Sequence, residues 1–160
     1  MTADDRGASS GPTSSPHPED PALYTARTDN IHGTTGEVRV HDGPTAHRAT
    51  LPTGGPSTPH QGFTPEQFLA MAWSTCLEET LRVVLAEREL PHQSSVSVEV
   101  DLHRDPAGGY RFAPRALVSI PDMAADEART IADAAHARCP VSKLLTGQGT
   151  PRVELVTADG

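Results

Sequence analysis

Two cysteines, Cys76 and Cys139, are the residues of this 160-residue chain with the clearest capacity for chemistry. In a reducing compartment, a cysteine pair in a chain of this size is catalytic, metal-bound or simply buried. Cys76 lies within an apolar helical pattern, and Cys139 precedes Pro140, with Ser142 and Lys143 close behind. One helix-buried and one helix-terminal cysteine suit a nucleophile and its resolving thiol. A lone cysteine on an apolar helix, however, is more often a small hydrophobe than a nucleophile.

Metal binding by the cysteines is the less favoured reading. The sequence contains eight histidines but no Cys-x-x-Cys, and no two histidines stand at i, i+4 on a predicted helix. The paired glycines at 54–55 and 108–109 are typical of turns rather than of phosphate-binding loops. We therefore expect neither a metal nor a bound cofactor.

A long helix is predicted to carry Cys76. Thr64, Pro65 and Gln67 provide an N-cap, a first-position proline and the third-position residue of a capping box. Apolar residues then recur at spacings of three and four until the pattern stops before Pro91. Cys76 lies about 12 residues from the capped end, where the helix dipole no longer acts. Activation of its thiol therefore requires another group.

The remaining pattern predicts an α+β fold with antiparallel strands around the long helix. Residues 24–51 alternate weakly around turn signals at residues 32–33 and 42–43, as in a short meander, with Arg39 facing opposite to its valine neighbours. Residues 95–102 and 110–120 form a hairpin, residues 122–137 form a second helix, and residues 153–157 form a final strand.

Composition sets the boundaries of the domain and excludes some partners. Residues 1–20 carry almost no bulky apolar side chains and are expected to be a disordered tail, followed by one domain over residues 21–160. The formal charge of −8 disfavours nucleic acids and anionic membranes as partners. The chain starts without a charged segment followed by an apolar run, so we expect no signal peptide, no membrane span and a cytoplasmic location.

Two segments carry a resemblance to a known family. The first runs from Phe63 through Glu66 to Cys76, and the second is Cys-Pro-Val-Ser-Lys at residues 139–143. They are similar to the two signature regions of the OsmC/Ohr family, in which a Pro-Glu segment lies ten residues before the reactive cysteine and a Cys-Pro-x-Ser segment follows later. The predicted order of elements fits as well, so the resemblance spans nearly the whole domain.

The resemblance implies a cysteine-based peroxidase of the oxidative stress response. Cys76 would attack an organic, fatty-acid-type hydroperoxide and become a sulfenic acid, and Cys139 would condense with it to a redox-active disulfide. A lipoyl-type dithiol would then reduce the disulfide. The apolar side chains of Phe68, Leu69 and Trp73 would suit the substrate chain.

The resemblance also implies an intertwined homodimer and a carboxylate, Glu66, that orients an activating arginine. Ten residues of continuous helix separate Glu66 from Cys76 by roughly 15 Å along the axis. Either the helix is broken between them, or Glu66 serves the cysteine of a partner chain. The arginine expected before the glycine of the first hairpin is absent, since His32 precedes Gly33 there. Arg27, Arg39 or Arg48 could replace it, and we assign Arg39.

A second departure concerns charge near the nucleophile. Glu79 lies three residues after Cys76, on the same helix face, and a nearby carboxylate opposes thiolate formation. The alternative function is therefore a weakly active or inactive OsmC-like domain that binds an apolar ligand or partner. The Cys-Pro-Val-Ser-Lys segment resembles OsmC more than Ohr.

Overall fold

The computed structural model describes residues 21–42, 49–57 and 61–156 of the protein. Its elements follow the order β1 (Arg27–Ile31), β2 (Glu37–Asp42), β3 (Thr50–Pro52), α1 (Pro65–Glu87), β4 (Ser95–Arg104), β5 (Tyr110–Ser119), α2 (Ala125–Arg138) and α3 (Pro140–Leu145). The predicted tail over residues 1–20 lies outside the described residues. The predicted α+β class with antiparallel strands and one long helix is confirmed.

Helix α1 begins where its capping residues predict. The Thr64 hydroxyl accepts the backbone N–H of Gln67, and the Gln67 side chain accepts the backbone N–H of Thr64 in return. Pro65 occupies the first helical position, where its missing N–H removes no helical hydrogen bond. The helix runs unbroken to Glu87. The possibility of a break between Glu66 and Cys76 is therefore wrong.

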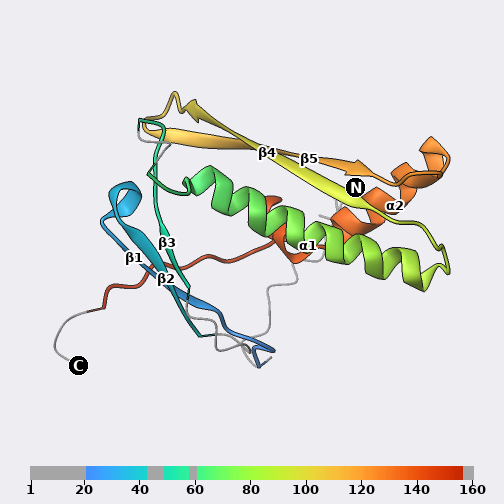
Figure 1. The fold of residues 1–160 in the computed structure, drawn as a ribbon, viewed down its shortest axis with the longest axis horizontal. Helices are drawn as coiled ribbons and strands as arrows, with labels where there is room; N and C mark the ends of the chain where they lie inside the picture. The colour runs from blue at the N-terminus through green and yellow to red at the C-terminus, as the bar shows by residue number, and fades with distance from the viewer. Residues whose placement is uncertain (1–20, 43–48, 58–60, 157–160) are drawn as a thin grey trace, which may run out of the picture.

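The strands form two separate antiparallel sheets. Strands β1, β2 and β3 pair in that order, and β4 pairs with β5 as the predicted hairpin. The hairpin turn uses Gly108 and Gly109, both with positive φ, a conformation that glycine adopts without strain. In Figure 1 the hairpin lies along α1, while the three-stranded sheet lies near the N-terminal end of that helix. The hairpin, α2 and α3 pack on α1.

The hydrophobic core lies where α1 meets α2 and the hairpin. Leu81 of α1 and Ile131 of α2 are fully buried at its centre. Cys139, between α2 and α3, is fully buried as well and belongs to the same cluster. The buried apolar residues of the described chain are Trp73, Leu77, Leu81, Val84, Leu85, Ile120, Ile131, Ala135 and Cys139.

The C-terminal part of the chain differs from the prediction in two ways. Cys139 ends α2 as expected, but Pro140 at once starts the short helix α3, which was not predicted. The final strand predicted over residues 153–157 is wrong for the described residues 153–156, which form an extended, exposed segment. Val153 and Leu155 are almost completely exposed. A strand requires a hydrogen-bonding neighbour, and none of the described strands pairs with these residues.

Candidate redox site

Helices α1 and α3 bring the two cysteines into contact. Cys76 lies on α1, and Cys139 is the N-cap residue of α3, which packs on α1. Both cysteines are free, and the Cys76 thiol donates a hydrogen bond to the Cys139 sulfur. Cys76 is half-buried, whereas Cys139 has no exposed surface. A molecule arriving from solvent therefore meets Cys76 first.

The pKa values of the two thiols shift in opposite directions. Burial raises the pKa of Cys76, the hydrogen bond and negative charge of Cys139 raise it further, and the Val141 backbone N–H opposes this change. Burial alone would raise the pKa of Cys139 as well. Hydrogen bonds from the Ser142 N–H and hydroxyl, from Cys76 and from the Val141 N–H outweigh it and lower that pKa. Within one chain, Cys139 is thus the more acidic thiol of the pair.

Ser142 is held in place by an aromatic partner. The Trp73 indole nitrogen donates to the Ser142 hydroxyl oxygen over 2.9 Å, and both residues are buried. Trp73 lies on α1, one turn before Cys76, and Ser142 lies on α3, three residues after Cys139. The same two helices therefore position the thiols and this hydrogen bond. The charged group that the sequence places beside Cys139, Lys143, is exposed.

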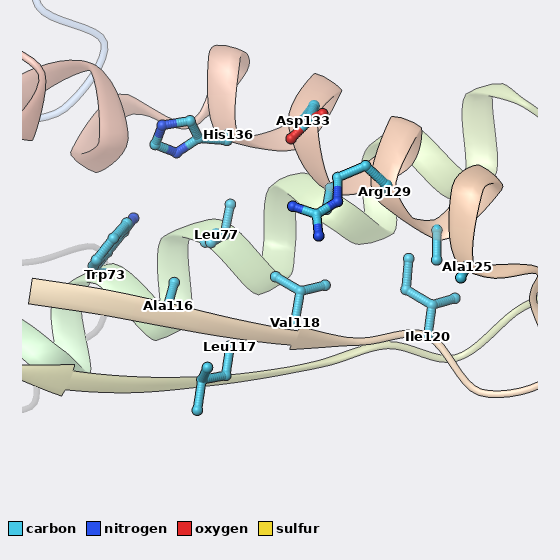
Figure 2. Close-up of a pocket in the computed structure, with 12 residues that line it drawn as sticks. Trp73, Leu77, Ala116, Leu117, Val118, Ile120, Ala125, Arg129, Asp133 and His136 are labelled. Carbon is cyan, nitrogen blue, oxygen red and sulfur yellow. The ribbon is translucent and has the colours of Figure 1, made fainter.

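A cavity of about 580 Å³ extends from Trp73 between β5 and α2. Figure 2 shows side chains of β5 reaching into it from one side and side chains of α2 lining the other. The His136 ring lies 6.5 Å from the Trp73 ring, centroid to centroid. The lining is apolar along the sheet and includes Arg129, Asp133 and His136 on the helix. Trp73 thus touches both the cavity and the hydrogen-bond network of the thiols.

The three predicted substrate-binding residues do not line one cavity. Phe68 lines a second cavity of about 390 Å³, together with Val38 and residues of the first hairpin. Leu69 is half-buried and lines neither of these two cavities. The spacing of these residues on α1 turns Phe68 toward the three-stranded sheet and Trp73 toward α2.

The predicted arginines pair with carboxylates of their own sheet. Arg39 lies on β2 and donates from Nε to Glu37 over 2.6 Å. Arg27 lies on β1, 3.5 Å from Asp29. Arg48 lies outside the described residues. The strongest influences on the pKa of Cys76 are burial, Val141 and Cys139, so no residue that the structure describes acts as a dominant cationic neighbour of this thiol.

The acidic residues near Cys76 act less strongly than the sequence suggests. Glu79 is exposed and pairs with Arg82 over 2.9 Å, and solvent screens such a charge. Glu66 lies in the first turn of α1, ten residues from Cys76 along an unbroken helix. The structure does not bring Glu66 and Cys76 of one chain together.

In the part of the chain that the structure describes, no three His, Cys, Asp or Glu side chains are grouped so as to hold a metal ion. Over the same ranges, none of the helices has the length and apolar character needed to cross a membrane.

Comparisons with known proteins agree on one family. The family described as OsmC-like protein matches residues 57–155. The organic hydroperoxide resistance protein OhrB of Bacillus subtilis is 27% identical over 84% of this chain and 98% of its own length. An organic hydroperoxide resistance protein-like protein of Mycoplasma pneumoniae is 34% identical over 77% of this chain and 87% of its own.

The fold agrees with that of solved relatives. The crystal structure of Bacillus subtilis OhrB matches with a TM-score of 0.71 and 27% identity, over 79% of this chain and 93% of the other. The family match extends over more than half of the sequence. This chain therefore belongs to the OsmC/Ohr family.

Proposed function

We propose that this protein is a thiol-dependent peroxidase that reduces organic hydroperoxides to alcohols. The observation that carries the proposal is the hydrogen bond between two free thiols, one half-exposed and one fully buried. The relatives named organic hydroperoxide resistance proteins support the substrate class. The proposal includes a reducing compartment, the cytoplasm, in which both thiols are regenerated.

Cys76 is the peroxidatic residue in this proposal, because a peroxide can reach it. Its sulfur attacks the distal peroxide oxygen, the O–O bond breaks, and the alkoxide takes up a proton and leaves as an alcohol. The Cys139 sulfur, in contact with the Cys76 thiol, accepts its proton as the attack begins. Because the pKa of Cys76 is raised and that of Cys139 is lowered, this transfer is uphill and adds to the barrier of the attack.

Cys139 is the resolving residue. The sulfenic acid formed on Cys76 loses its hydroxyl group as water when the Cys139 sulfur attacks it, and a disulfide results. The two sulfurs together supply the electrons that the peroxide accepts. A lipoyl-type dithiol then reduces the disulfide by exchange. Phe68, Leu69 and Trp73 do not line one cavity, so in this proposal they offer the substrate chain separate apolar contacts along α1.

A homodimer completes the proposed site. Glu66 is too far along α1 to act on Cys76 of the same chain. We assign it, together with Arg39, to the cysteine of a partner chain. The exposed apolar residues Val153, Leu155 and Val156 support a partner surface. Crosslinking and mass measurement in solution test this part, and a strict monomer would contradict it.

Intact mass spectrometry tests the reaction. The reduced protein is given one equivalent of cumene hydroperoxide, alongside Cys76→Ser and Cys139→Ser variants and a hydrogen peroxide arm. We expect rapid loss of two hydrogens in the wild type only, faster with the organic peroxide. A wild type that stays reduced for hours would reject the peroxidase.

The second candidate is an OsmC-like domain that binds an apolar ligand without turnover. The ion pairs that occupy Arg27 and Arg39 favour it, as does the raised pKa of Cys76. In this case the peroxide experiment leaves both thiols reduced, while an apolar fluorescent probe binds and quenches the Trp73 emission.

A further inference from the structure

Trp73 and Ser142 form a buried polar pair beside the thiols that peroxide chemistry does not itself require. Their side chains come from α1 and α3, residues 69 apart in sequence, and join over 2.9 Å. Trp73 is 7% exposed and Ser142 is 1% exposed. Water therefore has little access to either group, and the bond determines the orientation of both.

The hydrogen-bonding groups of this pair determine where the Ser142 hydroxyl proton points. An indole N–H can only donate, whereas a hydroxyl has one proton and two lone pairs. The Trp73 N–H occupies a lone pair of Ser142, so the Ser142 proton points to another acceptor. That acceptor is the Cys139 sulfur. The chain of donors runs from Trp73 through Ser142 to Cys139.

We propose that Trp73 and Ser142 are positioning residues of the redox centre, in which the Trp73 indole holds the Ser142 hydroxyl with its proton directed at the Cys139 sulfur. The inference deepens the proposed function and depends on that function for its catalytic consequence. A hydroxyl polarised by an N–H donor is itself a stronger donor, because adjacent hydrogen bonds reinforce one another.

The catalytic consequence concerns the reduction of the disulfide. In thiol–disulfide exchange, the sulfur of the more acidic thiol leaves more readily. Cys139 receives the Ser142 hydrogen bond and is buried, so it leaves as a thiolate while the reductant attacks the half-exposed Cys76. The reductant sulfur binds Cys76 as a mixed disulfide, and its second thiol then displaces Cys76. Trp73 and Ser142 thereby determine which sulfur the reductant binds.

The test measures the pKa of Cys139 directly. In a Cys76→Ser background, the only thiolate absorbance in the ultraviolet belongs to Cys139, and it is followed against pH. Ser142→Ala should raise that pKa by about one unit, which leaves roughly tenfold less thiolate below the pKa. Trp73→Phe keeps an aromatic ring but removes the N–H, and should cause a smaller rise.

A variant with both Ser142→Ala and Trp73→Phe tests whether the two residues act on Cys139 through one path. On the Ser142→Ala background, Trp73→Phe should add no further shift, because the indole acts only through the hydroxyl. Thr80→Ala is the matched control: its hydroxyl donates to the Cys76 carbonyl over 2.8 Å, and Thr80 is not among the groups that shift the pKa of either thiol. It should leave the pKa of Cys139 unchanged. Ser142→Thr, which retains the hydroxyl, should restore the lower pKa.

Three results would overturn the inference: no shift in Ser142→Ala, equal Trp73→Phe shifts in both backgrounds, or an equal shift in the control. If Ser142→Ala fails to fold, Trp73→Phe decides alone, and an unchanged pKa rejects the inference. The titration uses no peroxide. A shifted pKa in a protein that ignores peroxides therefore rejects the proposed function but keeps this inference.

Discussion

Oxidation of the thiol pair should make the protein substantially harder to unfold. A bond between Cys76 and Cys139 closes a loop of about 63 residues, and the chain-entropy account assigns such a crosslink about 4 kcal/mol of stabilisation. Forming the disulfide should cost little strain in the native state, because the two sulfurs are in hydrogen-bond contact before the bond forms. With a urea dependence of about 2 kcal/mol per molar, the midpoint should rise by about 2 M.

The assay compares urea unfolding of the reduced protein and of protein oxidised by stoichiometric peroxide, with the disulfide verified by mass. Cys139→Ser, treated identically, cannot form the bond and should keep its midpoint. An oxidised sample with an unchanged or lower midpoint would refute the reasoning, since it would mean that closing the bond distorts the packing of α1 and α3.

The two single-cysteine variants should respond to alkaline pH with opposite signs. The pKa of Cys139 is lowered on folding, so a chain that retains only this thiol should gain free energy of unfolding as pH rises from the folded pKa toward the ordinary one, and lose it as pH falls. The pKa of Cys76 is raised, so a chain that retains only Cys76 should lose stability as pH rises past the ordinary pKa of a thiol. Urea unfolding across pH measures the stability of both variants. If their stabilities change with pH in the same direction, the assignment is contradicted. Leu81→Ala should lower the free energy of unfolding by about 3 kcal/mol because Leu81 is fully buried. Val83→Ala, at a residue that is 39% exposed, should lower it by less than about 1 kcal/mol. Similar losses for the two variants in urea unfolding would argue against the described core. Thr64→Ala should cost about 1 kcal/mol through loss of the N-cap, seen as a lower thermal midpoint that Thr64→Asn restores.

Local signals were sufficient to predict most of the fold. The capping residues Thr64 and Gln67 fixed the start of α1, and strict alternation identified the hairpin of β4 and β5. Helix α3 was missed because six residues are too few to show a period. Pro140 was interpreted only as the end of α2, although proline is also favoured at a first helical position.

The site was less predictable because it depends on contacts between distant residues. Family resemblance paired Cys76 with Cys139, but the direction of their pKa shifts depends on where α3 places the N–H groups of Val141 and Ser142. The hydrogen bond from Trp73 to Ser142 joins two helices, and no local pattern signals it. From the sequence alone, Trp73 is expected only to provide an apolar contact to the substrate chain.

The exposed segment over residues 151–156 has a consequence for the order of events during folding. Ser142 is the last buried residue of the described chain, so every side chain of the core has been synthesised before this segment appears. The core can then fold within the single chain, at a rate independent of protein concentration, before residues 151–156 have been covered. An extended apolar segment left uncovered is prone to strand-to-strand aggregation. In the proposed homodimer, covering this segment by the partner chain would be a later step, with a rate that depends on protein concentration.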